Sequence, residues 1–271
     1  MKITKAVIPA AGHGTRFLPW TKAVPKEMLP LLNKPAIQYI VEEIAQSDMR
    51  SCVMITAPHK QAIANHFDVC PALEQFLKEK NKSNLLDELN KLSRSVELSY
   101  IHQEEAKGLG HAIWLARNAI AQEYFGILLP DDILISTNPG IKQLMDIAQQ
   151  ENASVIAVQE VPKENVSAYG VIAIKKQLSA NLFEISDLVE KPTANQAPSN
   201  LAIIGRYILS HTIFKALDEV KPSAGGEIQL TDGIATMLKK GERVIAYKIQ
   251  GTRYDIGTPA GWLHANIELA K

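Results

Sequence analysis

The residues nearest the amino terminus that could bind a phosphate are Gly12, Gly14 and Arg16, which follow an apolar run. Glycine has no side chain to hold a ligand away and can turn backbone N–H groups toward an anion, while arginine offers two parallel donors to phosphate oxygens. A second cation, Lys26, follows Pro25 further along the chain. This spacing predicts a phosphate-binding loop with two cations, although a glycine-rich loop taken alone is as often a plain turn.

The loop lacks the patterns of two commoner phosphate-binding motifs. Phe17 stands where a dinucleotide-binding fingerprint needs its third glycine, and the chain has no P-loop motif of the kind found in kinases and ATPases. Pro19, Pro25 and Pro30 prevent a helix from opening directly after the loop. They predict an extended, proline-stiffened segment that carries Lys26 to the phosphates.

The double motif formed by residues 12–19 and 25–30, GHGTRFLP and PKEMLP, resembles the signature of sugar-1-phosphate nucleotidyltransferases. Within that family it is most similar to the bacterial uridylyltransferase branch. The resemblance implies that the phosphate of glucose 1-phosphate attacks the α-phosphorus of UTP in line, with pyrophosphate as the leaving group. The alternatives are a thymidylyltransferase, a related nucleotidyltransferase acting on another hexose phosphate, and a non-catalytic sensor of sugar nucleotides.

Two adjacent carboxylates, Asp131 and Asp132, directly follow the apolar run 125–130. Burying carboxylates costs free energy unless a partner compensates their charge. Mg²⁺ is a suitable partner, because it favours one or two carboxylates together with phosphate oxygens and water. The resemblance assigns Asp131 to Mg²⁺, while Asp132, pointing to the opposite face, is expected to serve structure or to support the metal ligand from behind. Asp255 matches a second metal-side acid of the family, with a turn-forming Asp as the alternative.

The base and the sugar are assigned through the same resemblance. Gln103 ends a predicted strand and Gly108 precedes a helix, which places both at the carboxyl edge of the sheet, where open α/β sheets bind ligands. The resemblance implies that they contact uracil, although an amide fits thymine equally well. On the sugar side, it implies that Glu190 accepts hydrogen bonds from glucose hydroxyls and that Lys191 holds the sugar phosphate.

The remaining expected site residues lie in the loop and near the sugar. Gly170 would let the backbone approach a ring, and Glu227 is assigned equally to sugar contact or to helix capping. The catalytic set implied by the resemblance is Arg16 for the β- and γ-phosphates, Lys26 for the α-phosphate region, Asp131 and Lys191. The full substrate-binding set is Ala10, Ala11, Gly12, Gly14, Thr15, Glu27, Gln103, Gly108, Gly170, Glu190 and Glu227.

No general base is needed for this reaction, because a phosphomonoester with a second pKa of about 6 is already nucleophilic at neutral pH. The seven histidines show no shared spacing, which disfavours a zinc enzyme or a Ser-His hydrolase. A sensor would be expected to lose charged site residues, yet Arg16, Lys26, Asp131 and Lys191 are all present.

The elements that must position these residues alternate between strands and helices. Strands are predicted at residues 5–9, 51–56, 96–103, 125–130, 154–161 and 244–249, with helices at 35–47, 59–67, 110–121, 139–149, 211–220 and 230–240. Strands at 169–172, 183–189 and 201–209 are joined without full helices. Residues 72–92 are predicted to form an amphipathic helical insertion that covers the core, with a partner-binding face as the alternative.

This order predicts an α/β protein with a Rossmann-like, three-layer nucleotidyltransferase fold. Its central sheet is expected to be mixed and mostly parallel, with a small β-rich sugar-binding part. We expect one domain over residues 1–271, in which about 1–153 bind the nucleotide and about 154–271 bind the sugar phosphate.

The length, composition and charge of the chain restrict the classes of molecule that it can bind. The 271 residues are 46% hydrophobic, which is enough for one substantial core, and 29 basic residues balance 29 acidic ones. We therefore expect neither nucleic acid nor a membrane as a partner. The two cysteines lack the spacing of zinc ligands. No signal peptide is evident, so a cytoplasmic location is expected. We also expect a homo-oligomer, either a dimer or a tetramer.

Overall fold

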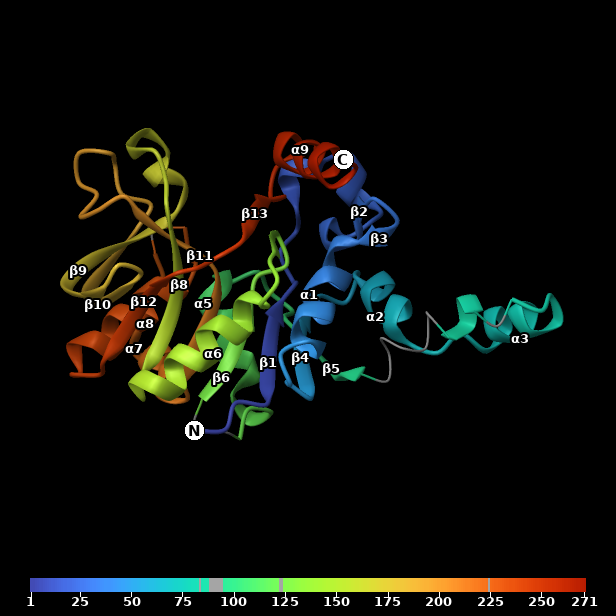
Figure 1. Cartoon of the computed structure of the whole chain (residues 1–271), viewed down its shortest axis with the longest axis horizontal. Coiled ribbons are helices and arrows are strands. Elements are labelled where there is room, and N and C mark those ends of the chain that lie inside the picture. Colours follow the sequence, from blue (N-terminus) through green and yellow to red (C-terminus); the bar gives the residue numbers. More distant parts are fainter. Residues whose placement is uncertain (83, 88–94, 122–123, 224) are drawn as a thin grey trace.

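A nine-stranded sheet forms the centre of the computed structural model, which describes residues 1–82, 84–87, 95–121, 124–223 and 225–271 (Figure 1). Its strands, in spatial order, are β5 (Glu97–His102), β4 (Ser51–Thr56), β1 (Lys5–Pro9), β6 (Tyr124–Leu128), β11 (Leu201–Ser210), β8 (Ser154–Glu160), β12 (Val244–Lys248), β10 (Leu182–Glu190) and β9 (Gly170–Ser179). The apolar runs of the sequence supply the central strands, and β6 and β11 are buried along their whole length.

The sheet is mixed, as predicted, and most of its strands run in one direction, but its neighbouring strands pair antiparallel as often as parallel. Strands β5, β4, β1 and β6 are mutually parallel, and β8 pairs in parallel with β12. Two strands, β10 and β11, run opposite to the rest. The predicted β-rich part is not a separate sheet, because β11 pairs with both β6 and β8 and so joins it to the amino-terminal strands.

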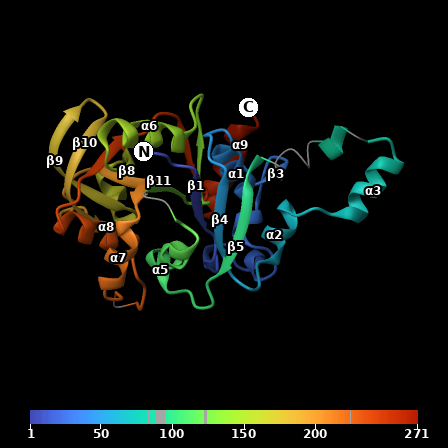
Figure 2. The same ribbon diagram turned by 90° about the horizontal axis from the view of Figure 1, so that it is seen from below.

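Helices cover both faces of the sheet, which confirms the three layers (Figure 2). One face packs against α1 (Ala36–Ala45) and α6 (Gly140–Glu151). The other face packs against α5 (Gly108–Leu115), α7 (Thr212–Glu219) and α8 (Leu230–Lys239). The predicted helix at 110–121 begins earlier, at Gly108, and ends in a short 3₁₀ turn, η4 (Ala116–Asn118).

The predicted helical insertion differs from its expected role. Helix α2 (Gln61–Phe67) leads into α3 (Pro71–Glu79), and Figures 1 and 2 show α3 standing away from the sheet instead of covering it. Leu73 and Phe76 of α3 are exposed. The prediction that the helix continues toward residue 92 falls partly on residues 83 and 88–94, which lie outside the described residues.

The segment between the glycine loop and α1 is not extended, which corrects the prediction from its prolines. It forms three short 3₁₀ turns, η1 (Thr15–Phe17), η2 (Trp20–Lys22) and η3 (Lys26–Met28), because prolines forbid a long helix but permit single turns. A small ribbon of β2 (Pro30–Leu31) and β3 (Lys34–Pro35) follows, and Pro35 is the N-cap of α1 instead of its first residue.

The carboxyl terminus returns to this segment. Strand β13 (Thr252–Asp255) pairs with β7 (Asp132–Ile135), and α9 (Pro259–Leu269) then packs beside β2 (Figure 1). Trp262 of α9 donates from Nε1 to the carbonyl of Pro30 at 2.8 Å. Both ends of the chain therefore contribute to one region of the molecule. None of the helices in the described residues is long and apolar enough to cross a membrane.

Phe125 of β6 offers a test of the core. Its ring is fully buried and stacks on Phe214 of α7 with centroids 5.2 Å apart. We expect Phe125→Ala to lower the free energy of unfolding by about 3–5 kcal/mol, because it leaves a cavity between sheet and helix. Urea unfolding measures the change. Leu263→Ala, at a side chain that is 53% exposed, should change it by less than about 0.5 kcal/mol.

Candidate active site

The glycine loop and the segment that carries Lys26 are packed against each other. Gly14 has a φ of 65°, and a Cβ there would lie 3.2 Å from the Cβ of Lys26. The hydroxyl of Thr21 donates to the carbonyl of Gly14 at 2.8 Å. A glycine is therefore required at position 14 both for the left-handed turn and for the close approach of Lys26.

A buried lysine behind the loop holds the two segments together. The ammonium of Lys60 donates to the carbonyls of Ala10 and Gly12 at 2.7 and 2.6 Å, and it pairs with the carboxylate of Glu27 at 2.9 Å. The backbone N–H of Ala10 is also engaged, with Ile55. Ala10 and Glu27 use these polar groups to fix the loop, and their expected substrate contacts stay predictions.

Lys26 and Asp131 form an ion pair at the mouth of the loop, with 2.7 Å between Nζ and Oδ2. Burial raises the pKa of Asp131, but Lys26 and then Arg16 lower it more, so that it stays below its ordinary value. Burial lowers the pKa of Lys26, but Asp131 and Glu27 raise it above its ordinary value. Both groups are therefore charged at neutral pH.

Asp132 has the structural role that the sequence predicted. Its side chain is buried, pairs with Nε of Arg253 at 2.5 Å and accepts a hydrogen bond from the N–H of Gly205 at 2.8 Å. Burial raises the pKa of Asp132, and the nearby Asp131 carboxylate adds to that rise while Arg253 opposes it. The two adjacent carboxylates therefore have opposite pKa shifts, and Asp131 lines both hollows of the cleft while Asp132 lines only the smaller one.

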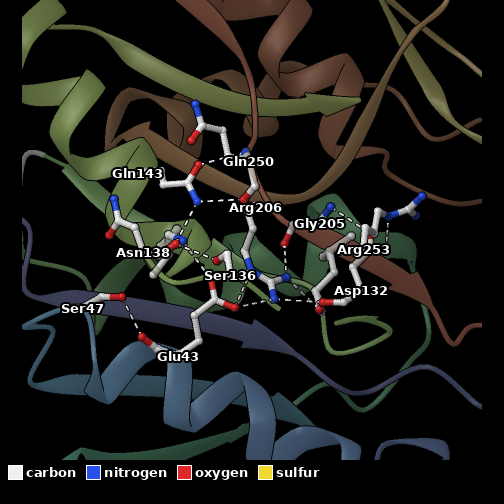
Figure 3. Close-up of polar contacts among 12 residues, drawn as sticks. Glu43, Ser47, Asp132, Ser136, Asn138, Gln143, Gly205, Arg206, Gln250 and Arg253 are labelled. Carbon is white, nitrogen blue, oxygen red and sulfur yellow. Dashed lines mark hydrogen bonds and ion pairs between the residues drawn. The ribbon is translucent and has the colours of Figure 1, made fainter. Parts of the chain in front are cut away.

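A buried ion pair supports the turn that carries Asp131 (Figure 3). Arg206 of β11 donates to both carboxylate oxygens of Glu43 in α1, the shortest contact being 2.7 Å. Its remaining N–H groups reach the carbonyls of Leu129 at 3.3 Å, Gly205 at 2.9 Å and Asp132 at 2.9 Å. All five donors of the guanidinium are used, and two of them hold the ends of the turn at residues 129–132.

The residues that could hold a metal surround Gly257. A Cβ at this glycine would lie 3.1 Å from Oδ1 of Asp255, 3.4 Å from Oδ2 of Asp131 and 3.6 Å from Nη1 of Arg16. The absent side chain lets the two carboxylates and Arg16 come close to the backbone here, so that Asp131 and Asp255 lie on one side of the cleft as a pair of oxygen donors for a cation that takes one or two protein oxygens. No group of three or more potential protein ligands occurs within the described residues. Such a site therefore fits Mg²⁺ with substrate oxygens completing its coordination, and not a closed zinc site.

Asp255 also forms the turn that the sequence offered as its alternative role. Its Oδ1 accepts a hydrogen bond from the N–H of Gly257 at 3.0 Å, and its Oδ2 accepts one from the hydroxyl of Tyr169 at 3.1 Å. Arg253 lies 3.3 Å from the same carboxylate and 5.1 Å from the Tyr169 ring. The pairing of β13 with β7 brings these groups beside Asp132, far away in the sequence.

The sugar-side residues lie where β10 ends. Lys191 has a φ of 45°, a conformation that is uncommon for a lysine, and its N–H donates to the carbonyl of Tyr169 at 3.0 Å. Glu190 accepts a hydrogen bond from the hydroxyl of Thr231 at 3.0 Å, and a Cβ at Gly170 would lie 3.2 Å from its Oε2. Lys191 remains half exposed, with its ammonium 3.6 Å from Glu190.

These parts line two adjoining hollows of about 520 and 260 Å³ that share Asp131, Glu190 and Lys191. The larger hollow gathers the loop, the base-side and part of the sugar-side predictions: Ala11, Gly12, Gly14, Thr15, Lys26, Glu27, Gln103, Gly108 and Glu227. The smaller hollow gathers Arg16, Gly170 and Asp255. The predicted charges therefore line one continuous cleft.

Two predicted residues at the base side and the sugar side have further contacts. The side-chain nitrogen of Gln103 lies 3.3 Å from the carbonyl oxygen of Gly108 and 2.8 Å from Nδ1 of His111. Glu227 accepts a hydrogen bond from the side chain of Gln229, which is itself the N-cap of α8. Glu227 is therefore not a helix cap, and its sugar contact stays a prediction.

A family profile described as "Nucleotidyl transferase" matches residues 5–271, almost the whole chain. The chain belongs to the nucleotidyl transferase family. This nucleotidyl transferase is 48% identical over 99% of its length to the UTP--glucose-1-phosphate uridylyltransferase of Bacillus subtilis, and the match covers 91% of that protein. A protein of the same name from Staphylococcus epidermidis is also 48% identical, over 99% of this chain and 93% of its own.

Solved structures give the same family. A UDP-glucose pyrophosphorylase complexed with UDP-glucose superposes with a TM-score of 0.91 and 41% identity, over 99% of both chains. A UTP-bound UGPase from Acinetobacter baumannii superposes with a TM-score of 0.91 and 34% identity, over 99% of this chain and 93% of that one. The predicted nucleotidyltransferase fold is confirmed.

Some residues of this nucleotidyl transferase site were missed from the sequence. Lys60, Arg206 and Arg253 do not belong to the quoted motifs, and their partners lie far away along the chain. The usable signal for Lys60 was its place just after β4, at the same edge of the sheet as the glycine loop. Arg206 gave a weaker signal, as a charged residue inside an otherwise apolar strand.

The buried pair behind the Asp131 turn should be costly to break. We expect Arg206→Met to lower the free energy of unfolding by about 3–5 kcal/mol, because Glu43 is left buried without its partner. Urea unfolding measures the loss.

Two further variants control this experiment. Arg243→Met removes an arginine that is 39% exposed and pairs with Glu151 and Glu184, and it should cost less than about 1 kcal/mol. Arg206→Met combined with Glu43→Leu should recover much of the loss, since no unpaired charge remains. A double variant as unstable as the single one would contradict this explanation.

Proposed function

We propose that this nucleotidyl transferase transfers the uridylyl group of UTP to glucose 1-phosphate, giving UDP-glucose and pyrophosphate. The observation that carries the proposal is the charge distribution: Arg16, Lys26 and Lys191 line one cleft with Asp131, in a chain of zero formal net charge. Two polyanionic substrates repel each other, so this reaction needs local neutralisation more than it needs a base. The names of the relatives support UTP over dTTP.

The chain's own groups have separate roles in this proposal. The N–H groups of the glycine loop and Arg16 bind the β- and γ-phosphates, and Lys26 holds the α-phosphate in line with the sugar phosphate. A phosphate oxygen of glucose 1-phosphate forms the new bond to the α-phosphorus as the bond to the pyrophosphate oxygen breaks. Lys60 has no contact with the substrates here and fixes the loop from behind.

Asp131 and Asp255 would hold Mg²⁺. A bound Mg²⁺ supplies charge neutralisation for the phosphate oxygens as pyrophosphate leaves. The ion pair with Lys26 keeps the Asp131 carboxylate charged and aimed at the cleft until substrate arrives.

Lys191 and Glu190 serve the sugar phosphate and the sugar in this proposal, with Gly170 and Glu227 beside the ring. Gln103 and Gly108 serve the base. The nucleotide part would therefore lie mainly in residues 1–153 and the sugar part mainly in 154–271, with Asp255 crossing that division. The expected homo-oligomer and cytoplasmic location stay predictions.

Loss of the Asp131 carboxylate should stop the reaction without unfolding the chain. We expect Asp131→Ala to reduce pyrophosphate release by at least about 10²- to 10³-fold, the usual loss for one preorganised electrostatic contact. A coupled pyrophosphate assay measures this, with thermal unfolding alongside. Asp146→Ala, at an exposed helix pair with Lys142, should leave turnover unchanged. Turnover near that of the unaltered chain in Asp131→Ala would rule out its metal role.

Lys191 should be required for one substrate and not for both. We expect Lys191→Ala to raise the KM for glucose 1-phosphate by about 10- to 150-fold, the loss of one hydrogen bond to a charged group, with little change in the KM for UTP. Initial-rate kinetics with each substrate varied in turn measure both values. Lys175→Ala, at an exposed lysine paired with Glu184, is the matched control. Equal rises for both substrates would undo the assignment.

A further inference from the structure

Gln103 is the polar side chain at the base end of the cleft, and its surroundings are well defined. It directly follows β5, its backbone N–H donates to the carbonyl of Thr56 at 2.8 Å, and it is 6% exposed. Its neighbours in the hollow include Ala11, Ala106 and Leu109, which form an apolar setting for a flat ring. What this amide can recognise depends on which of its two ends faces the ligand.

The contacts of Gln103 settle that orientation. One atom of its amide lies 3.3 Å from the carbonyl oxygen of Gly108 and 2.8 Å from Nδ1 of His111. A carbonyl oxygen only accepts hydrogen bonds, so this atom must be the NH₂ nitrogen, which donates both of its hydrogens. Nδ1 of His111 must then be an acceptor, which means that the imidazole is neutral and carries its proton on Nε2.

The surroundings of His111 agree with a neutral ring held in place. Burial lowers the pKa of His111, and Lys107 and Arg117 lower it further, while Glu105 opposes them. The imidazole stacks on Trp114 with centroids 6.1 Å apart and 19° between the planes. Trp114 is itself fixed by a hydrogen bond of 2.7 Å from its Nε1 to Asp218 of α7.

The amide oxygen of Gln103 is therefore the end left for a ligand. Both amide hydrogens are used inside the protein, and the oxygen has no hydrogen-bond partner among the described residues. An acceptor in this place matches a pyrimidine whose N3 carries a hydrogen, as in uracil and thymine. Cytosine has a lone pair at N3, which would face the lone pairs of the amide oxygen, and a site built around one hydrogen bond strongly rejects an analogue that cannot make it.

We propose that His111 is a specificity-determining positioning residue, which fixes the amide of Gln103 so that the site accepts pyrimidine nucleotides with an N3–H and rejects cytidine nucleotides. This inference rests on the proposed function, because it takes the larger hollow as the nucleotide site. His111 acts through Gln103 and does not itself contact the base. Without it, only the longer contact of 3.3 Å with the carbonyl of Gly108 opposes a turn of the amide that would offer its NH₂ to N3 of cytosine.

The test uses His111→Leu and His111→Asn in the full chain. Equilibrium binding of UTP, CTP and dTTP is measured by calorimetry, and kcat/KM is measured for each nucleotide with glucose 1-phosphate. We expect His111→Leu to reduce the UTP:CTP preference at least tenfold in both measurements. The UTP:dTTP ratio should stay unchanged, because both bases carry N3–H. His111→Asn, whose side-chain oxygen can take the place of Nδ1, should keep more of the preference than His111→Leu.

Other results would overturn the inference. An unchanged UTP:CTP ratio in His111→Leu would show that the amide is oriented without His111. Equal losses for UTP, CTP and dTTP, with a lower Tm, would show that His111 only supports the fold. The binding arm separates this inference from the proposed function: a chain that binds UTP over CTP through His111 but forms no UDP-glucose would contradict only the proposed reaction.

Discussion

The contact between Lys26 and Asp131 joins the two sides of the cleft, and much of the surrounding structure keeps its two charges in place. A cation and an anion at 2.7 Å stabilise each other when they are partly removed from water. Each charge is also held from behind by a buried ion pair. Lys60 and Glu27 fix the segment of Lys26, while Arg206 and Glu43 fix the turn of Asp131.

These buried pairs are costly elements of the fold. Replacing a buried ion pair with apolar side chains is often neutral or stabilising, so stability alone does not explain why a chain carries two of them. Both pairs here bond to backbone carbonyls of the segments that bear the cleft's charged groups. Their position is consistent with a role in geometry: they restrict where Lys26 and Asp131 can lie.

Much of this arrangement could be predicted from the sequence, and the residues that were missed share one property. Apolar runs identified the central strands, and the glycine loop, Lys26 and Asp131 were found because they lie in short motifs. The contributions of Lys60, Arg206 and Arg253 depend on partners brought together only by the folded sheet. The insertion that contains α3 was expected to cover the core because its pattern is amphipathic, yet periodicity identifies an apolar face and not what packs against that face.

The place of β11 limits how the cleft can move. This strand is hydrogen-bonded to β6 on one side and to β8 on the other, and it is buried along its whole length. A swing of one half of the sheet against the other would break backbone hydrogen bonds on both sides of this strand. Substrates must therefore be taken up and released with the pairing of β6, β11 and β8 intact, which makes the centre of the sheet a fixed floor for the cleft.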